Sequence, residues 1–523
     1  MSTEVKTFTR AEVATHNTEE SLWIIIDSKV YDITKFIKFH PGGKHVLLEL
    51  GGKDATKAFY DLHRVDILKK YDRFRIGIIA GEEKVAATVP WPADGEISKV
   101  PYAENPAWQG WKSAYFNESH YRMRIAVRKF LEKEVVPLLP AMEDQGKEPS
   151  IELYKKMGQF GLLAARIGPG KALTLTPNGL PGGVKPEEFT YFHEQIAHEE
   201  IARLGCPGAT DGLAAGMVIG LPPVLLFGRP EVSEKVGREV LAGEKRICLA
   251  ITEAFAGSDV AQIRTTATKT PDGKYYIVNG TKKWITNGSF SDYFVTAVRT
   301  GPLSAGAKGV SLLLIERSEG VATQKIITSY SPAAGTAFVT FDNVKVPVEN
   351  LLGKENGGFA CIMANFNHER WLIIVGVVRA TRLVVEECFK WAHQRTVFGK
   401  PLIAQPVIRE KLAHMVAQLE SVYHWIEAIT YQMTKLSYAE QTKLLAGPIA
   451  LCKLQATRVA YDVSDKACQI FGGRAITRTG MGQIIERFQR SIKYGAILGG
   501  SEEIMADLGI KQAMKYMPKN SRL

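Results

Sequence analysis

The sequence predicts a multidomain α+β protein, and three observations support that prediction. Its 523 residues exceed what one ordinary hydrophobic core accommodates. Alternating β-forming residues occur in the first eighty residues and again between Leu249 and Gly353, whereas stretches with apolar residues at helical spacing fill most of the remainder. A proline-rich segment, Glu82 to Pro106, separates the first block from the rest. We therefore expect a small N-terminal domain, a helical domain, a β-domain and a second helical domain.

The composition is that of an ordinary globular chain with an excess of positive charge. Apolar residues make up 45% and charged residues 23% of the chain. The net charge of +11 suits an anionic ligand, a membrane surface or nucleic acid, but the charges are interspersed and no basic helix carries interleaved aromatic residues. This pattern favours a phosphorylated small molecule over nucleic acid. The longest uncharged run, Gly212 to Gly228, contains a Pro-Pro pair and predicts a buried helix and no membrane span.

The cysteines and the two ends of the chain bear on the cellular compartment. Six scattered cysteines without C-x-x-C spacing argue against a disulfide framework and a zinc site, and they fit a reducing compartment. The N-terminus lacks the apolar core of a secretion signal and has an acidic residue too early for a mitochondrial presequence. The last residues, Ser521, Arg522 and Leu523, form a close variant of the S-K-L peroxisomal address. We expect a peroxisomal protein, or a cytoplasmic one if the tripeptide is not read.

The first eighty residues contain two histidines in a pattern that suits haem. His40 stands before a Pro-Gly-Gly loop and His63 follows a helical stretch, with apolar residues around both, namely Phe36, Phe39, Val46, Leu47, Phe59 and Leu62. Two such histidines would fill both axial positions of a haem, which would then carry electrons and not bind oxygen. His45 is the alternative ligand. The stretch from Phe8 to Ile79 resembles the cytochrome b5 family, although Leu62 stands where that family more often has glycine. It looks closer to b5 domains fused to flavoenzymes, which implies that haem b accepts electrons from a flavin in the same chain.

The rest of the chain is organised around two motifs that suit a flat cofactor. The loop I-T-E-A-F-A-G-S-D starts at Ile251, and N-G-T-K-K-W-I-T-N-G starts at Asn279; a Pro-Asp-Gly turn lies between them. Hydroxyl and backbone N–H groups of the loop suit a polar heterocycle or a pyrophosphate, while Trp284 can cover an aromatic ring and Thr286 can reach its polar edge. The pair of motifs resembles the flavin-binding β-domain of the acyl-CoA dehydrogenase family, and matching segments run from about Trp111 to Ala513. The resemblance implies an FAD site that includes Ile251, Thr252, Ser258, Trp284 and Thr286.

The resemblance also implies a domain order. The expected fold is a small cytochrome b5-like haem domain followed by an acyl-CoA dehydrogenase fold, with an α-helical domain, a β-barrel-like domain and a C-terminal four-helix bundle. The boundaries are 1–80 for the haem domain, 81–106 for a semi-extended linker that lets this domain move, 107–245 for the first helical domain, 246–355 for the β-domain, 356–515 for the second helical domain and 516–523 for an exposed tail.

A single glutamate is expected to do the acid–base chemistry. In the family the base that removes the α-proton of the thioester lies either near the C-terminus or on the helix that follows the β-domain. Here the C-terminal stretch Y-G-A-I-L-G-G-S-E-E-I-M places Gly499 at the first position, whereas the helix reads H-E-R-W, with Glu369 before Arg370. We predict Glu369 as the base, with a pKa raised by an apolar pocket. The alternative is a surface or salt-bridged glutamate paired with Arg370 or Arg379.

Further residues are assigned through the resemblance. The segments H-Q-R-T-V-F-G-K-P-L and C-Q-I-F-G-G-R-A-I-T-R imply binding of the FAD diphosphate and adenine across a subunit interface. The residues carried over are Arg395, Phe398, Gln405, Gln469, Gly472, Gly473, Ser501 and Glu503. Contacts to the CoA side are expected from Ser258, Asn367 and Arg370. The protein is expected to form a homo-oligomer, either a dimer or a tetramer.

One polar stretch is a decoy for metal chemistry. H-E-Q-I-A-H-E-E, from His193 to Glu200, has histidines five residues apart, so they do not share a helix face as in a zinc protease. We expect a solvated helix face there.

Three functions remain open at this point. The first is an FAD-dependent acyl-CoA dehydrogenase that forms a trans-2-enoyl-CoA and passes electrons to its own b5 haem or to an external acceptor. The second is an acyl-CoA oxidase in which oxygen reoxidises the flavin. The third is a non-catalytic b5 electron carrier on a degenerate, ligand-binding scaffold, for which Gly499 is the argument. The acyl group is not specified, although a base on the helix favours branched or long chains.

Overall fold

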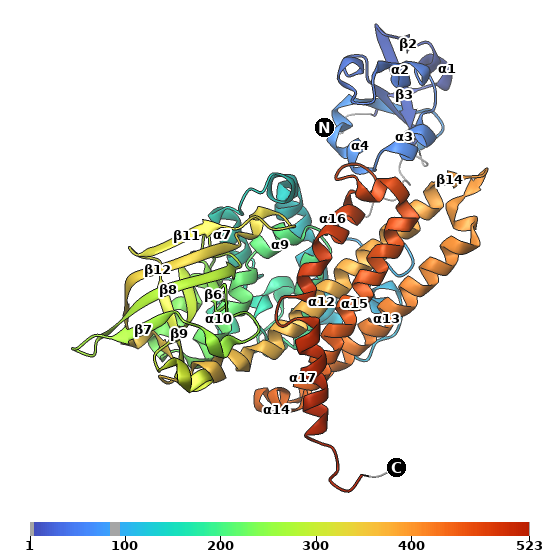
Figure 1. Cartoon of the computed structure of the whole chain (residues 1–523). Coiled ribbons are helices and arrows are strands. Elements are labelled where there is room, and N and C mark those ends of the chain that lie inside the picture. The colour runs from blue at the N-terminus through green and yellow to red at the C-terminus, as the bar shows by residue number, and fades with distance from the viewer. Residues whose placement is uncertain (1–4, 84–94, 522–523) are drawn as a thin grey trace. The chain divides into compact units, whose positions relative to one another are not determined.

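The structure is a computed structural model, and it describes residues 5–83 and 95–521 (Figure 1). By contacts the chain divides into two compact units. Unit 1 contains the N-terminal residues together with Cys388–Arg409 and Cys468–Glu486; unit 2 contains the segments from residue 94 to Glu387, from Glu410 to Ala467 and from Arg487 onward. Each unit is described by itself.

The N-terminal part of unit 1 is a five-stranded sheet with short helices. The strand order is β1-β5-β4-β3-β2, with β1 parallel to β5 and the other pairs antiparallel. A Thr9 capping box starts α1. Leu22, Ile24 and Tyr31 are buried in the core of this sheet. The elements are β1 Thr7–Phe8, α1 Arg10–Ala14, β2 Asn17–Thr18, β3 Ser21–Ile26, β4 Lys29–Asp32, α2 Lys44–Glu49, α3 Thr56–Leu62, α4 Asp66–Lys70 and β5 Arg75–Ile79.

The two later segments of unit 1 contain a small hairpin and a helix end. The hairpin is formed by β14 (Thr396–Val397) and β15 (Lys400–Pro401), which pair antiparallel. Trp391 stacks on Phe471 with ring centroids 5.4 Å apart, and the guanidinium of Arg474 lies 4.9 Å from the Trp391 ring. These contacts hold the segment before the hairpin against the end of helix α15 (Ala446–Phe471).

Unit 2 contains a mixed eight-stranded sheet. The order is β11-β12-β8-β7-β9-β10-β13, and β6 pairs in parallel with β9. The predicted Pro-Asp-Gly turn joins β7 to β8, where the N–H of Gly273 donates to the carbonyl of Thr270 at 2.9 Å. The strands are β6 Ile247–Ala250, β7 Thr266–Lys269, β8 Tyr275–Ile285, β9 Tyr293–Arg299, β10 Val310–Glu316, β11 Val321–Lys325, β12 Ala337–Pro347 and β13 Leu351–Leu352.

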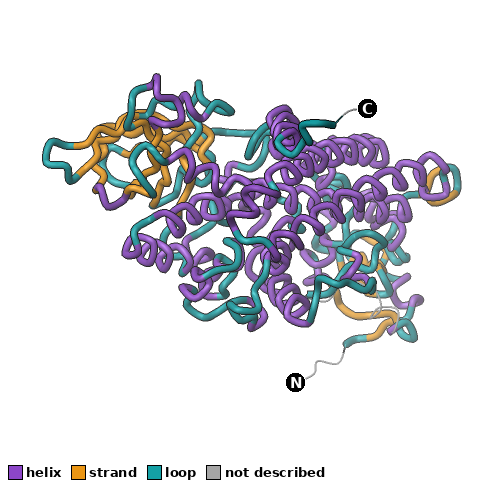
Figure 2. The backbone as a smooth tube through the Cα atoms, turned by 90° about the horizontal axis from the view of Figure 1, so that it is seen from below, coloured by secondary structure: helices purple, strands orange, loops and turns teal. Residues whose placement is uncertain are grey.

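Helices precede and follow this sheet in the sequence. The first group is α6 Glu118–Phe130, α7 Ile151–Gln159, α8 Tyr191–Ala202, α9 Pro207–Gly212, α10 Ala215–Phe227 and α11 Pro230–Leu241. The second group is α12 Gly358–Gln394, α13 Pro406–Lys435, α14 Tyr438–Leu444, α15 Ala446–Phe471, α16 Gln483–Ser491 and α17 Glu502–Met514. The long helices α12, α13 and α15 run side by side, and helices predominate outside the sheets (Figures 1 and 2).

Helix α8 overturns the expectation of a solvated face. Of its twelve residues, ten are buried, including His193, Glu194 and Glu200. The charged groups are compensated by partners far away in the sequence; Glu200, for example, pairs with Arg128 at 2.6 Å. Because those partners come from other helices, the local pattern of α8 resembles that of a surface helix although the helix is internal.

The described part of the expected linker beyond residue 94 belongs to a folded unit. Residues 95–111, which we call the strap, pack on unit 2. The carboxylate of Glu104, 3% exposed, pairs with Arg128 at 2.8 Å and with Arg379 at 3.2 Å. Trp108 of the strap is also buried. The semi-extended, mobile linker predicted over 81–106 is therefore wrong from residue 95 onward, because buried arginines of α6 and α12 hold this stretch.

One stretch, Pro207–Phe227, is long and apolar enough by length and composition to cross a membrane. In the structure it breaks between α9 and α10, where Ala214 has a φ of 73°. Eight residues of α10 are buried, and this helix packs against β6 and α11. The prediction that this stretch is buried is thus confirmed, although the stretch forms two helices.

Candidate active site and haem pocket

Glu369 lies in the middle of α12 with its carboxylate inside the protein. It is 7% exposed, and the side-chain amide of Asn365, one turn earlier, donates to its Oε1 at 2.9 Å. Burial raises the pKa of Glu369 to about 7, while the Asn365 hydrogen bond and the charges of His368 and Arg370 oppose that rise. A carboxylate with this pKa can be ionised near neutral pH and still hold a proton that it has accepted.

The salt-bridged alternative for Glu369 is not what the structure shows. Within the described residues no ion pair joins Glu369 to Arg370 or Arg379. The Nε of Arg370 donates to the carbonyl oxygen of Gly499 at 2.9 Å, and Arg379 pairs with Glu104. The carboxylate of Glu369 is therefore not neutralised by an arginine.

Gly499, the other position for a base, lies beside the same helix. A Cβ at residue 499 would come within 2.8 Å of Ile373 Cδ1 and 3.8 Å of Arg370 Cγ. Its φ of 63° also favours glycine. The Nζ of Lys453 donates to the next carbonyl, that of Gly500, at 2.7 Å. Arg370 and Lys453 together fix the Gly-Gly turn that precedes α17.

The predicted flavin loop and the second motif are joined by a buried ion pair. The Nζ of Lys282 lies 2.8 Å from Glu253 Oε1 and also donates to the carbonyl of Ile251 at 2.9 Å. The backbone N–H of Lys283 donates to the carbonyl of Thr252 at 2.8 Å. Glu253 is thus a structural residue that holds Ile251 and Thr252 beside β8.

Side chains of the loop that starts at Ile251 and of the segment that starts at Asn279 reach the surface beside this ion pair. Trp284 is 50% exposed and has a φ of 66°, which is rare for an aromatic residue. Ser258 is exposed, and Thr252 and Thr286 are half-buried. An exposed indole with hydroxyl groups nearby in sequence fits the face and edge of a flat heteroaromatic ring such as the isoalloxazine of FAD.

Helix α10 contacts both the end of the second motif, next to Thr286, and helix α12, which carries Glu369. The side-chain amide of Asn365 lies 3.5 Å from the carbonyl of Ile219 on α10. At the start of α10, the N–H of Gly216 donates to the side chain of Asn287, directly after Thr286, at 2.7 Å. The predicted base and the predicted ring-binding loop are therefore packed against one common helix.

The remaining residues predicted for FAD lie in unit 1, apart from Ser501 and Glu503. Phe398 is 94% exposed, with a φ of 50°, at the turn of the β14–β15 hairpin. Gly472 and Gly473 are exposed, and a Cβ at either would meet no atom within 4 Å. Arg395 and Gln405 are half-buried and Gln469 is exposed. These groups are accessible to a ligand or a partner.

The last predicted contacts lie on α12 and α17. Ser501 caps α17, with its hydroxyl 3.5 Å from the N–H of Ile504, and Glu503 is exposed in the first turn. Asn367 is half-buried. Arg370 is buried, and its Nε is engaged by Gly499, so it orients the Gly-Gly turn in addition to any substrate contact.

In unit 1 the two predicted haem ligands face each other. The rings of His40 and His63 have centroids 6.0 Å apart, at an interplanar angle of 79°. This separation leaves room for one metal ion at about 2 Å from a nitrogen of each ring, the usual distance for histidine ligands. His45 is exposed on α2 and has no such partner among the described residues. The pair supplies two ligands, which is what a haem iron needs from the protein.

The surroundings of the pair fit ligation by neutral imidazoles. Nδ1 of His40 lies 3.1 Å from the carbonyl of Gly43, so a proton on Nδ1 would leave Nε2 free to bind a metal. A Cβ at Gly42 would come within 2.8 Å of His40 Cε1, so glycine makes room for the ring. Burial, assisted by the charge of His40, lowers the pKa of His63. Phe39 and Leu62, next to the two histidines in sequence, are exposed apolar side chains that a haem face can cover.

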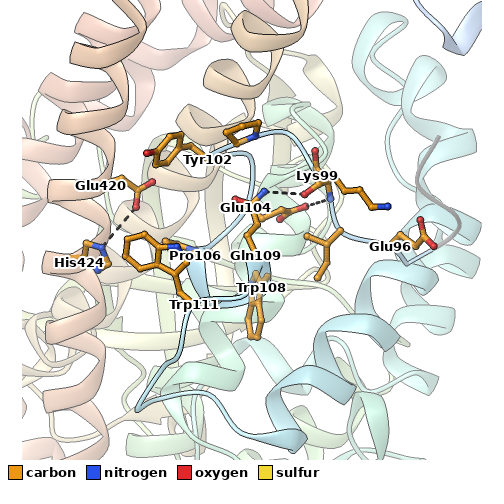
Figure 3. A pocket seen from close by; sticks show the side chains of 13 residues that line it. Glu96, Lys99, Tyr102, Glu104, Pro106, Trp108, Gln109, Trp111, Glu420 and His424 are labelled. Atoms are coloured by element: carbon orange, nitrogen blue, oxygen red, sulfur yellow. Dashed lines mark hydrogen bonds and ion pairs between the residues drawn. The ribbon is translucent and has the colours of Figure 1, made fainter. Parts of the chain in front are cut away.

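Two cavities in unit 2 lie away from these groups. The larger, of about 780 Å³, opens between the strap and α13 and is lined by Tyr102, Trp108 and Trp111 with Glu420 and His424 (Figure 3). None of the predicted site residues lines it. The second, of about 580 Å³, is lined by Arg264, Thr266, Lys269 and Thr300 together with Glu355, which pairs with Lys269 at 2.8 Å.

Sequence reasoning missed two features around Glu369. One is Lys453, which is buried and whose pKa burial lowers to about 8. The other is the buried pair of His368 with Glu194 on α8. Both depend on contacts between helices distant in sequence, so no local pattern signals them.

Comparison with known protein families gives four consecutive matches. The cytochrome b5-like heme/steroid binding domain matches residues 9–80. The acyl-CoA dehydrogenase N-terminal domain matches 117–244, the middle domain 248–344 and the C-terminal domain 356–514. Fold and site thus define a flavin-dependent oxidoreductase with a haem module.

Individual relatives agree. The acyl-CoA dehydrogenase apdG of Emericella nidulans is 42% identical over 425 residues, 80% of this chain and 96% of that protein. The acyl-CoA dehydrogenase AFT10-1 of Alternaria alternata is 40% identical over 423 residues, again 80% and 96%. A solved structure of a probable acyl-CoA dehydrogenase from Mycobacterium abscessus has a TM-score of 0.68 and 30% identity, covering 76% of this chain and 100% of that one. The chain belongs to the acyl-CoA dehydrogenase family and carries an N-terminal cytochrome b5 domain. Its cofactors are FAD and haem.

Proposed function

We propose that this protein oxidises an acyl-CoA to a trans-2-enoyl-CoA and that Glu369 removes the α-proton. The observation that carries the proposal is the buried carboxylate of Glu369, unpaired with arginine and with its pKa raised by burial to about 7. Bound FAD supplies the hydride acceptor for this reaction. The base must also be dry, because water would compete for the proton, and 7% exposure meets that need.

The developing negative charge on the thioester oxygen needs a hydrogen-bond donor. The N–H of Glu369 is in mid-helix and donates one turn back, so it is not available. Gly499 lies beside α12 with its carbonyl bound by Arg370. Within the described residues its N–H has no protein acceptor, which supports Gly499 as the backbone donor to the thioester carbonyl. Gly499, which has no side chain that could act as a base, would then contribute its backbone N–H as a hydrogen-bond donor.

The test uses Glu369→Gln in the full-length protein with FAD bound. Removing a general base lowers kcat by about 10²- to 10⁴-fold, while flavin content should stay at the wild-type value. Glu502→Gln, which changes an acid near Gly499 in sequence, tests the alternative base. An active Glu369→Gln variant would contradict the proposal. Inactive Glu369→Gln with FAD retained also decides against a non-catalytic scaffold, provided that the wild type bleaches its flavin with an acyl-CoA.

The second part of the proposal is an electron route through the N-terminal domain. His40 and His63 would fill both axial positions of the haem, so this domain suits electron transfer and not oxygen binding. We infer that electrons from acyl-CoA oxidation reach this haem and leave to an external acceptor. In anaerobic stopped-flow, haem reduction should follow flavin bleaching. A haem that stays ferric while the flavin bleaches rules out the relay.

The competing function is reoxidation by oxygen, as in acyl-CoA oxidases. The variant His63→Ala, which removes an axial ligand, separates the two. Stoichiometric peroxide from this variant with acyl-CoA in air would favour the oxidase, whereas slow turnover without peroxide supports the relay. A panel of straight and branched acyl-CoAs, scored by flavin bleaching, tests the expectation of a long or branched substrate.

Oligomerisation and location complete the proposal. Oligomers are typical of the family, and the exposed Phe398, Gly472 and Gly473 support FAD contacts completed by a partner subunit. The tail is exposed as far as Ser521, whereas Arg522 and Leu523 lie outside the described residues. We propose peroxisomal import through these three residues and a role in fatty-acid β-oxidation there. A fluorescent fusion that stays cytosolic with its C-terminus free would contradict the import signal.

A further inference from the structure

A histidine and a glutamate form a buried pair beside the proposed base. His368 precedes Glu369 on α12, and its Nε2 lies 2.9 Å and 3.1 Å from the two carboxylate oxygens of Glu194 on α8. Glu194 is 0% exposed. The imidazole also stacks on Trp371, with centroids 5.7 Å apart, and Trp371 is fixed by a hydrogen bond to Thr430 at 2.9 Å. The ring is therefore held in one orientation.

The environment of each partner favours the charged form of the other. Burial alone would lower the pKa of His368, but the charge and hydrogen bond of Glu194 outweigh it and raise this pKa above its ordinary value. Burial opposes ionisation of Glu194 as well, yet the charge on His368 holds its pKa at about 2. The contact with Glu194 thus favours the imidazolium form of His368.

A second histidine near the same carboxylate differs. His198, also on α8, has its Nε2 3.7 Å from Glu194 Oε1, too far for a hydrogen bond. Burial lowers the pKa of His198 to about 4, so this ring is neutral. Of the two histidines that face Glu194, only the one next to the base is within hydrogen-bond distance of this carboxylate.

The other polar groups around these residues are few. Glu369 is faced by Asn365 and Arg370 from its own helix and by Tyr438 from α14. The pair is faced by His198 and Tyr191 from α8 and by Arg166, which precedes α8 in the chain. Arg370 also binds the carbonyl of Gly499, and a positive charge on either Arg370 or His368 lowers the pKa of Glu369.

We propose that His368, kept as an imidazolium by Glu194, is a positioning residue whose charge keeps Glu369 ionised in the closed, dry site. The inference rests on the proposed function, since it takes Glu369 to be the base. Burial drives the Glu369 carboxyl toward its protonated form, which cannot accept the α-proton. A fixed positive charge one residue away opposes that effect in a medium of low dielectric constant. The pair is neutral overall, so it can lie in the interior.

A purely structural role of the pair, linking α8 to α12, makes a different prediction. Loss of a cross-link lowers stability and leaves the pH dependence of the reaction unchanged. Loss of a charge moves the acid limb of kcat/KM, which reports the base in the free enzyme. The pH profile therefore separates the two roles.

The experiment measures kcat/KM against pH for the flavin-loaded, full-length protein with an acyl-CoA that bleaches its flavin. In His368→Gln and in Glu194→Gln the acid limb should move to higher pH by roughly half a unit to one unit. The double variant should move no further than His368→Gln, because both changes remove the same charge. The matched control His198→Gln should keep the wild-type limb.

Folding and flavin loading are checked by Tm and by the absorbance ratio of flavin to protein. Glu194→Asp keeps the negative charge, so it tests the pair where an uncharged variant does not fold, and it should retain the wild-type limb. An unmoved limb in His368→Gln or Glu194→Gln overturns the inference, as does an equal shift in His198→Gln or a displaced limb in Glu194→Asp. Full activity of Glu369→Gln would instead show that the proposed function has failed.

Discussion

At the scale of single residues, chemistry and stability oppose each other at Glu369. Its environment favours the neutral carboxyl, with a pKa of about 7 against an ordinary value of 4.5. The folded state therefore binds this proton more tightly than the unfolded state does. The stability gained is complete below about pH 4.5 and is lost as the pH rises through 7.

This linkage predicts a pH-dependent gain of stability in Glu369→Gln. Glutamine keeps a partner for Asn365 and cannot ionise, so its free energy of unfolding should rise relative to wild type between about pH 5 and pH 8. The difference should reach up to about 3 kcal/mol. Urea unfolding at a series of pH values measures it. Glu234→Gln, an exposed site, is the control that should show a flat difference, and a flat difference at Glu369 would contradict the burial argument.

The haem pair allows a second prediction at this scale. In Gly42→Ala the new Cβ would lie 2.8 Å from His40 Cε1, so the ring must shift. We expect less haem per protein, while FAD content stays unchanged because the substitution lies outside the segments that match the acyl-CoA dehydrogenase domains. Absorbance spectra give the haem-to-flavin ratio. A wild-type ratio in Gly42→Ala would show that His40 is placed by other contacts.

Motifs located several of these residues, but not the groups that tune them. H-P-G-G with a later histidine indicated His40 and His63, and H-E-R-W indicated Glu369; each signal lies within a short stretch. His368 was part of the same motif, yet its role depends on Glu194, which is distant in the sequence and meets it only in the fold. Lys453 was missed for the same reason.

At the scale of elements, helix α8 shows how a polar pattern can be internal. Its Glu200 pairs with Arg128 of α6, which also pairs with Glu104 of the strap. Elements with local signals were predicted correctly, such as the Pro-Asp-Gly hairpin and the helix after the β-domain that carries H-E-R-W. The packing of the strap was not predicted. The proline content of 81–106 indicates an extended chain, and it carries no signal for the buried arginines that pair with Glu104.

The strap gives a prediction for stability. Glu104→Ala leaves Arg128 and Arg379 without a carboxylate that both contact, and breaking a buried pair in this way costs about 3–5 kcal/mol. We expect a lower Tm and faster proteolysis within residues 95–106. Lys57→Ala breaks an exposed pair with Asp61 and should cost less than about 1 kcal/mol. Equal effects of the two substitutions would contradict the role of burial.

At the scale of the whole molecule, the haem ligands and the proposed base lie in different compact units of one chain. The sequence predicted both modules and their order, because each has its own motif. It gave no geometry for electron transfer between them. Whether electrons pass between the two modules of one molecule is decided by the dependence of the rate of haem reduction on protein concentration.

A relay within one molecule predicts that the rate of haem reduction by acyl-CoA does not depend on protein concentration. Covalent linkage fixes the effective concentration of the haem domain, whereas transfer between separate molecules is second order. Stopped-flow at several protein concentrations under anaerobic conditions measures the dependence. Rates that rise in proportion to concentration would indicate exchange between molecules, and His63→Ala is the control for signals that do not come from the haem.

The buried carboxylate of Glu104 also decides where the flavoprotein half can be cut for separate expression. A fragment that begins at residue 107, the boundary suggested by sequence, lacks Glu104. Arg128 and Arg379 then lose this buried carboxylate, and we expect the fragment to aggregate. A fragment that begins near residue 95 retains the carboxylate of Glu104. We therefore expect the longer fragment to give the more stable enzyme.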